Sequence, residues 1–130
     1  MRVLLDTHIL LWMIGESRTL SAVARRILAD ETNELFFSPI SIAEVAVKRQ
    51  KNVALMPLSP DDVRFGAEES GVRELAFDSS HAVALTTLPM HHRDPFDRML
   101  LAQAKSSGMK ILSTMTSSPR MGTSSSRFDL

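Results

Sequence analysis

Three acidic residues stand beside segments that are predicted to be strands, and together they could bind a metal ion. Asp6 follows the first short apolar run, and Glu44 lies in the first turns of the helix after the second. Asp97 opens the helix that precedes a later run. Strand ends of a parallel sheet meet at one edge, so all three can converge there. Clustered carboxylates repel one another unless a divalent cation neutralises them. Oxygen ligands favour Mg²⁺ or Mn²⁺ over zinc, and such a site can hydrolyse phosphodiesters.

Each of these acids also has a simpler interpretation. Asp6 can serve as the N-cap of the next helix, and Glu44 precedes Lys48 by four residues, which is the spacing of a weak surface ion pair. Asp97 falls in a first helical turn, where the helix dipole favours a carboxylate. Asp94, just before a proline, is a good N-cap for the same helix. Capping alone would produce most of this pattern, and the spacing permits the metal site without requiring it.

Alternating strand and helix patterns predict an α/β fold in which helices flank a parallel sheet. Ser41 to Glu44 offers a capping box for the third helix, and residues 53–60 are predicted to be an extended connection. Trp12 is predicted to be a packing residue, and His81 a surface or packing residue rather than a ligand. We expect strands at 2–5, 34–37, 72–77 and 110–112, and helices at 9–14, 20–28, 39–50, 61–70, 79–85 and 95–107.

Composition limits the class of protein. A chain of 130 residues with 44% hydrophobic and 23% charged residues is long enough for one globular domain with a core. Fifteen basic and fifteen acidic residues balance, so a nucleic-acid role must depend on a local patch. The chain has no cysteine, its start turns polar too soon for a secretory signal, and no run is long enough to span a membrane. We therefore expect a cytoplasmic protein.

The character of the chain changes after Leu112. Residues 113–126 are rich in serine and threonine, and they show neither a helical nor a strand period. We expect a flexible tail or loop there, with 127–130 a candidate to return to the body of the domain. The sequence thus predicts one folded domain over residues 1–114 and an atypical Ser/Thr-rich tail over 115–130.

Three stretches of the chain together resemble the PIN domain, and most of all the VapC-type toxins of bacterial toxin–antitoxin pairs. They are Leu4 to His8, Ser38 to Lys48, and His92 to Arg98 with 101–104, and their order, their spacing and the chain length all match. The resemblance covers about residues 2–114. It implies a three-layer α/β/α sandwich with a central, mainly parallel sheet and the activity of a Mg²⁺- or Mn²⁺-dependent ribonuclease.

The resemblance also implies roles for individual residues. Asp6, Glu44 and Asp97 would be the catalytic, metal-binding acids, and Thr7 would help to orient the site beside Asp6. Asp94 we assign to helix capping. Such proteins usually form homodimers, and a cognate antitoxin holds them inactive by inserting a segment into the cleft. Positive charge for the RNA backbone would come from four residues that could equally be ion-pair partners of the acids: Lys48, His92, Arg93 and Arg98.

The sequence departs from the family pattern after the strand at 110–112. Family members usually show Ser or Thr there and then a fourth acid, whereas Ser113-Thr114 is followed by Met115-Thr116-Ser117-Ser118, with no acid before Asp129. The leading expectation is an endoribonuclease toxin. The alternative is a degenerate PIN domain that binds antitoxin or RNA without cleaving it. A nucleotide-binding α/β domain has little support, because no glycine-rich loop follows a predicted strand.

Overall fold

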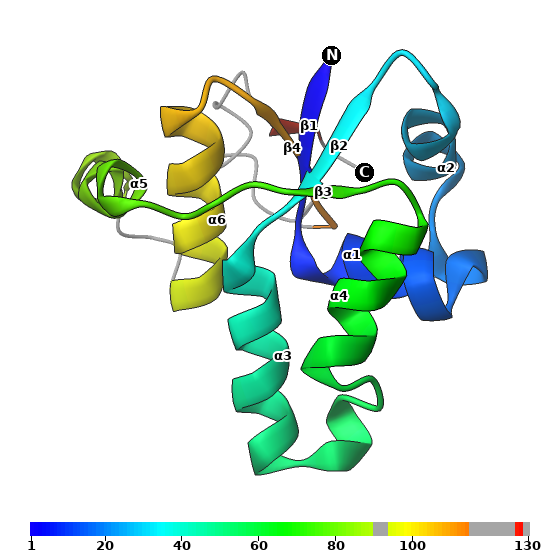
Figure 1. The fold of residues 1–130 in the computed structure, drawn as a ribbon. Coiled ribbons are helices and arrows are strands. Elements are labelled where there is room, and N and C mark those ends of the chain that lie inside the picture. The colour runs from blue at the N-terminus through cyan, green and yellow to red at the C-terminus, as the bar shows by residue number, and fades with distance from the viewer. Residues whose placement is uncertain (90–93, 115–126, 129–130) are drawn as a thin grey trace.

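A parallel sheet forms the centre of the fold (Figure 1). The computed structural model describes residues 1–89, 94–114 and 127–128, and within them the strand order is β3-β2-β1-β4-β5, with every neighbouring pair parallel. This arrangement confirms the predicted α/β class. The strands are β1 (Arg2–Leu5), β2 (Glu34–Phe37), β3 (Arg73–Glu74), β4 (Lys110–Leu112) and β5 (Arg127–Phe128).

The last strand bears on the predicted tail. Residues 127–128 form β5 and pair with β4, which confirms that this part of the chain returns to the body of the domain. The sheet therefore extends into the range 115–130. The other predictions for the tail fall on residues 115–126 and 129–130, which lie outside the described residues.

Helices connect the strands and cover the sheet. None of the helices in the described part of the chain is long and apolar enough to cross a bilayer. Three short 3-10 turns complete the connections: η1 (Ser17–Thr19), η2 (Val53–Leu55) and η3 (Ala84–Thr87). The α-helices are α1 (Thr7–Gly15), α2 (Ala22–Ala29), α3 (Pro39–Lys51), α4 (Pro60–Glu69), α5 (Ser79–Val83) and α6 (Pro95–Ser106).

Two hydrophobic cores lie on opposite faces of the sheet. Successive side chains of a strand point to opposite faces, so Val3 and Leu5 pack with α1, α2 and α4, whereas Leu4 packs on the α6 side with Leu100 and Ala104. All five residues are fully buried. Because helices cover both faces, the strands are continuous apolar runs rather than alternating ones. The three-layer α/β/α sandwich is thereby confirmed (Figure 1).

Helix starts follow the capping chemistry of the sequence, with one exception. The Asp6 carboxylate accepts a hydrogen bond from the Ile9 amide, so α1 begins two residues earlier than predicted, at Thr7. The prediction of a capping box at Ser41 to Glu44 is wrong. Ser38 caps α3 instead, because its hydroxyl accepts from the Ile40 amide and the proline that follows it occupies the first helical position.

Two connections differ from their predicted form. The segment 53–60 is not simply extended, because it contains η2, whose start is capped by the Asn52 side chain, and because Met56 is buried in the core. The third strand is shorter than the predicted 72–77, since only Arg73 and Glu74 pair with β2. Beyond this strand, the Leu75 amide still donates to a β2 carbonyl, and the chain then leaves the sheet for α5.

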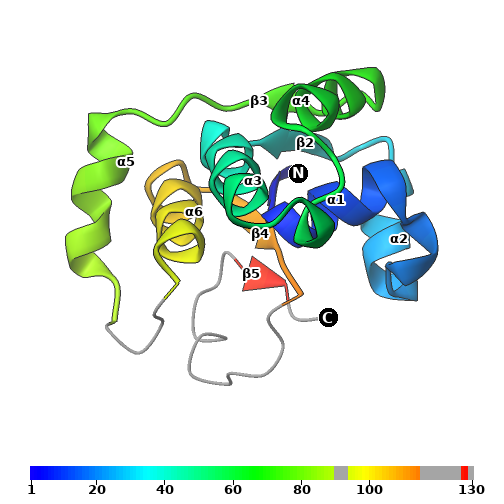
Figure 2. The same ribbon diagram turned by 90° about the horizontal axis from the view of Figure 1, so that it is seen from below.

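The strands all end at the same edge of the sheet, and Figure 2 looks onto that edge. Because α1 follows β1 and α3 follows β2, both helices begin there. Helix α6 precedes β4, so its first turn lies at this edge as well. In Figure 2, α3 lies between α1 and α6. The fold therefore brings the starts of three helices together, and each of them carries one of the predicted acids.

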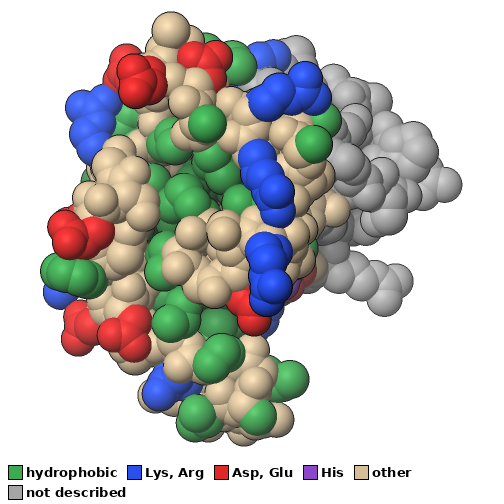
Figure 3. All heavy atoms as spheres, turned by 90° about the vertical axis from the view of Figure 1, so that its right-hand side faces the viewer, with side chains coloured by type: hydrophobic (Ala, Val, Ile, Leu, Met, Phe, Trp, Pro, Cys, Tyr) green, Lys and Arg blue, Asp and Glu red, His purple; other side chains and the backbone are tan. Residues whose placement is uncertain are grey.

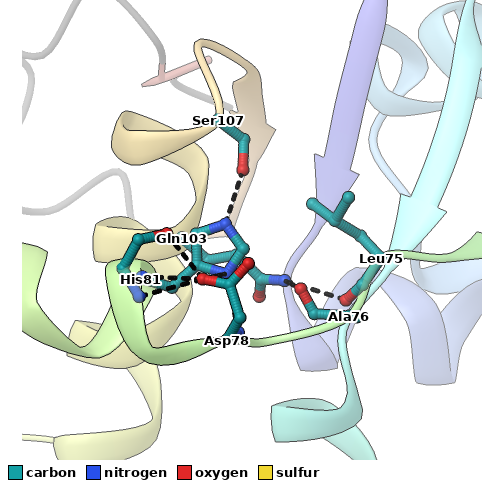
Figure 4. Close-up of polar contacts among 7 residues, drawn as sticks. Leu75, Ala76, Asp78, His81, Gln103 and Ser107 are labelled. Carbon is teal, nitrogen blue, oxygen red and sulfur yellow. Dashed lines mark hydrogen bonds and ion pairs between the residues drawn. The ribbon is translucent and has the colours of Figure 1, made fainter.

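A network of hydrogen bonds positions the far end of α6 (Figure 4). The Gln103 amide donates to the carbonyls of Leu75 and Ala76 at 2.8 and 3.2 Å. His81 is buried and packs against Phe77. Its Nδ1 accepts from the Asp78 amide at 3.0 Å, and its Nε2 lies 3.0 Å from the Ser107 hydroxyl. His81 is therefore a packing residue, as predicted, and not a surface one.

Candidate metal-dependent active site

Asp6 lies at the carboxyl end of the central strand and is almost completely buried. One carboxylate oxygen caps α1 at 2.9 Å from the Ile9 amide, and the other accepts from the Thr114 amide at 3.4 Å. Burial raises the pKa of Asp6 above its ordinary value, while hydrogen bonds from Ile9, Ser113 and Thr114 and the charge of His8 oppose the shift. Capping and a place in the site are thus compatible roles for this acid.

Glu44 lies in the second turn of α3, with only 2% of its surface exposed. Its Oε2 forms an ion pair and hydrogen bond with the ammonium of Lys48, one turn further along the helix. Within the described residues, its Oε1 is buried and has no hydrogen-bond partner. The predicted pair therefore exists, but the interpretation of it as a surface pair is wrong, because the carboxylate is inside the protein.

Asp97 lies in the first turn of α6, and its pKa is raised to about 7. Burial is the largest cause, followed by the negative charges of Asp94, Glu44 and Asp6, whereas Lys48 opposes the shift. Acids that perturb one another in this way must lie within electrostatic range. The charges of Asp6 and Glu44 therefore act on Asp97 from neighbouring elements, although no three acids of the described residues are close enough together to form a metal-binding group.

Two neighbours of this cluster have clear structural functions. Asp94 caps α6, because its Oδ1 accepts from the amides of Phe96 and Asp97 at 2.9 and 3.2 Å, as predicted. Partial burial alone would lower the pKa of Lys48, but its hydrogen bond to Glu44 and the charges of Glu44, Asp94 and Asp97 outweigh this and raise the pKa. The ammonium of Lys48 therefore remains charged among the acids.

Hydroxyl groups support the site from two sides. The buried Thr7 hydroxyl donates to the hydroxyl of Ser41 at 2.9 Å, which ties the start of α1 to α3. Ser113 is buried and hydrogen-bonded to Asp6. The sequence predicts a site role for Thr7 but not for Ser41 or Ser113. A signal for Ser113 was its position directly after a predicted strand, whereas nothing in the sequence distinguishes Ser41 from a capping serine.

The predicted positively charged residues have different environments. The Arg98 guanidinium donates to the carbonyls of Pro89 and Leu85 at 2.7 and 3.4 Å, so it anchors the segment that follows η3. His92 and Arg93 lie outside the described residues. A contact of any of these side chains with RNA stays a prediction.

The chemistry of the acid cluster fits a hard divalent cation. The donors are carboxylate oxygens, which Mg²⁺ and Mn²⁺ prefer. Glu44 Oε1, which is buried and has no hydrogen-bond partner among the described residues, is an acceptor suited to a cation. In the segments that the structure describes, the acids are not already gathered into a set of three ready to enclose one ion. The Glu44 carboxylate is instead engaged by Lys48. Asp6, Glu44 and Asp97 are the residues that could hold the metal.

A cavity of about 460 Å³ lies away from these acids. It is found where α2 and α4 end and β2 and β3 begin, at the opposite edge of the sheet, and residues such as Asp30, Glu34 and Arg73 line it. None of the predicted site residues is among the lining side chains. The chemistry of the acids, rather than the size of this cavity, therefore identifies the candidate site.

Comparison with known proteins agrees with this geometry. A family model of the PIN domain matches residues 3–115, so the chain belongs to the PIN domain family. A structure of VapBC2 from Rickettsia felis bound to a promoter DNA fragment aligns with a TM-score of 0.67 and 12% identity, covering 99% of this chain and 100% of that one. A toxin–antitoxin complex from Klebsiella pneumoniae aligns with a TM-score of 0.59 and 18% identity, covering 98% and 99% of the two chains. No curated protein matches the sequence.

Proposed function

We propose that this chain is a divalent-metal-dependent endoribonuclease toxin of a VapC-type toxin–antitoxin pair. The observation that carries the proposal is that Asp6, Glu44 and Asp97 are held on elements that meet at the carboxyl edge of the sheet, where burial and the charges of Asp94, Glu44 and Asp6 raise the pKa of Asp97 to about 7. Buried carboxylates that repel one another are costly for stability and are typical of functional sites. PIN domain membership and the fold shared with toxin–antitoxin structures support the same class.

In this proposal the three acids hold Mg²⁺ or Mn²⁺. The bound ion would supply an activated water and stabilise developing charge during hydrolysis of an RNA phosphodiester. Asp6 is held in place by three hydrogen bonds, and Thr7 fixes the start of α1 against Ser41. Asp97 must lose its proton to bind the ion, which the raised pKa makes harder near neutral pH. Lys48, His92, Arg93 and Arg98 would contact the RNA backbone.

Calorimetric titration with Mn²⁺ tests the metal site. We expect Asp6→Asn and Asp97→Asn each to weaken Mn²⁺ binding by about 100-fold or more, because each removes a charged oxygen ligand. The matched control is Asp61→Asn, which also removes an acid from a first helical turn, but one that is 89% exposed on α4. Equal Mn²⁺ affinity in all four proteins, or no binding in any, would contradict the proposal.

Cleavage of RNA tests the activity itself. The wild-type chain is expected to cut a mixture of cellular RNAs in Mg²⁺ or Mn²⁺, to stop when EDTA is added, and to lose activity in Asp6→Asn. Asp61→Asn should cleave as the wild type does. Cleavage that persists in EDTA would contradict a metal-dependent mechanism.

A second candidate function is a PIN domain that binds antitoxin or RNA without cleaving it. The observation in its favour is that Met115-Thr116-Ser117-Ser118, the stretch after Ser113-Thr114, contains no acid where the family pattern has a fourth one. Ser113 and Thr114 both donate hydrogen bonds to Asp6, so they hold this carboxylate without adding a further metal ligand. Mn²⁺ binding without RNA cleavage would favour this second function over the first.

Exposed apolar side chains support a protein partner. Figure 3 views the side of the molecule that carries α2 and α4, where hydrophobic side chains gather in a hollow beside a row of basic ones. On the surface of η2 and α4, Leu55 and Phe65 are 72% and 65% exposed. Large apolar groups at a surface are typical of interaction sites. We propose that the chain forms a homodimer and binds a cognate antitoxin.

Two measurements test these partners. Light scattering during gel filtration should give twice the mass of the chain at micromolar concentration. The mass of one chain at all concentrations would contradict a homodimer. Coexpression with the product of a short reading frame adjoining the gene should give a complex in which RNA cleavage is suppressed. We place the activity in the cytoplasm, where its substrate RNA is found.

A further inference from the structure

Lys48 lies among the acids of the candidate site. Its ammonium contacts Glu44 Oε2, and the charges of Asp94 and Asp97 also act on it. Its side chain is 36% exposed, whereas that of Glu44 is 2% exposed. Lys48 therefore joins a buried carboxylate to the solvent, and it provides positive charge in the place where the acids would otherwise face one another.

A carboxylate as buried as Glu44 is costly to the fold unless a cation lies beside it. An unpaired buried charge is strongly destabilising, and removing one partner of a buried pair leaves this penalty in full. Glu44 Oε1 lacks a hydrogen-bond partner within the described residues, so the pair with Lys48 is the main compensation seen for this charge. Without Lys48, the folded protein would require another cation at the same place.

We propose that Lys48 is a resident counter-ion that a divalent cation displaces from Glu44. This inference depends on the proposed function, because it assumes that Glu44 is a metal ligand. Lys48 and Glu44 lie one turn apart on α3, so the flexible side chain of Lys48 can turn outward without any movement of the helix. The exchange would free Oε2 for the incoming ion and release the ammonium toward the solvent, where it could meet a phosphate of the RNA.

The first part of the test uses thermal unfolding in EDTA. Lys48→Met should lower the Tm by about 5 °C or more, because it leaves the buried Glu44 charge unpaired. The double variant with Glu44→Gln should recover most of this loss, because the buried charge is gone. Lys51→Met is the matched control, since it removes an exposed lysine from the same helix. Equal Tm values for Lys48→Met and the control would overturn the proposal.

The second part is a Mn²⁺ titration of the same variants. Lys48→Met should bind Mn²⁺ about tenfold or more tightly than the wild type, because two cations no longer compete for one carboxylate. Lys51→Met reports the general effect of losing one positive charge and should stay within about threefold of the wild type. If Lys48→Met unfolds in EDTA, its refolding on addition of Mn²⁺ would give the same support.

The outcomes separate this inference from the proposed function. If the wild type binds Mn²⁺ and Lys48→Met binds it no more tightly than Lys51→Met, the displacement is wrong while the metal site stands. If neither the wild type nor Lys48→Met binds Mn²⁺, the metal site itself is wrong, and the displacement falls with it. If Lys48→Met binds Mn²⁺ more tightly than the wild type and Lys51→Met does not, the result supports both the metal site and the displacement of Lys48.

Discussion

The two ends of α6 both place polar side chains in the interior, but with opposite electrostatic results. At the end of the helix, the Gln103 amide donates to backbone carbonyls, and the His81 ring bonds to the Asp78 amide and the Ser107 hydroxyl. At its start, Asp97 faces other carboxylates, and its pKa is raised to about 7. One end gains stability from its polar contacts, while the other loses stability.

Aspartates at helix starts show the same contrast. Asp78 begins α5, and hydrogen bonds from the Ser80 side chain and the His81 backbone lower its pKa. Asp97 also lies at a helix start, where the dipole alone would favour its charge, yet its pKa rises. The neighbours and the burial therefore decide the outcome, not the helix position. A local excess of negative charge of this kind is typical of functional sites, which agrees with the proposed metal site.

The largest effect is expected at the end of α6 that carries Gln103. Gln103→Leu keeps the side-chain volume but removes the donor of two hydrogen bonds, to the carbonyls of Leu75 and Ala76, so it should lower the free energy of unfolding by about 1–3 kcal/mol. Urea unfolding followed by circular dichroism measures this loss. Gln50→Leu, at an exposed position of α3, is the control, and an equal loss in both would show that the network contributes nothing.

A substitution at the start of α6 is expected to change the free energy of unfolding in the opposite direction. Asp97→Asn removes a carboxylate that other acids repel, so in EDTA at pH 8 it should raise the free energy of unfolding by about 1–2 kcal/mol, after allowance for solvent screening. Urea unfolding again measures the change. A lower stability in Asp97→Asn would mean that this carboxylate stabilises the fold, and the contrast between the two ends would disappear.

The same site predicts a pH dependence. Because the pKa of Asp97 is raised from 3.8 to about 7, the folded chain retains a proton that the unfolded chain has lost between these values. This contribution to stability is therefore greatest below about pH 4 and falls as the pH rises to about 7. The difference in unfolding free energy between Asp97→Asn and wild type should grow over this range. A constant difference from pH 5 to pH 8 would rule out the shift.

The smallest effect is expected at Ser107, the outermost residue of the hydrogen bonds around His81. Ser107→Ala removes the hydroxyl that partners His81 Nε2 and should lower the free energy of unfolding by about 0.5–1.5 kcal/mol. The adjacent Ser106→Ala, at an exposed position on the last turn of α6, is the matched control. If the two variants unfold at the same urea concentration, the contact with His81 makes no net contribution to stability.

Local sequence signals predicted most of the fold. Apolar runs located the strands because both faces of a parallel sheet are covered, and Asp94 marked the start of α6 because its capping chemistry is local. The errors arose where distant contacts decide the structure. Ser41 has the spacing of a capping residue, but its hydroxyl is used by Thr7, 34 residues away in the sequence.

The site was only partly predictable for the same reason. The order of the strands and the positions of the acids indicated that Asp6, Glu44 and Asp97 could meet, and the resemblance to PIN domains selected them. Burial of Glu44 could not be predicted, because a glutamate four residues before a lysine is more often exposed. The bond from Ser113 to Asp6 spans most of the chain, and no local pattern encodes it.

The central place of β1 in the sheet affects the order in which the site can form during synthesis. β1 lies between β2 and β4, so the strand that carries Asp6 gains its second neighbour only after residue 112 has been made. At ordinary translation speed that delay is roughly 5 to 20 seconds. Asp97 also follows Asp6 by most of the chain. A nascent chain would therefore lack the complete candidate site until nearly the whole domain had emerged from the ribosome.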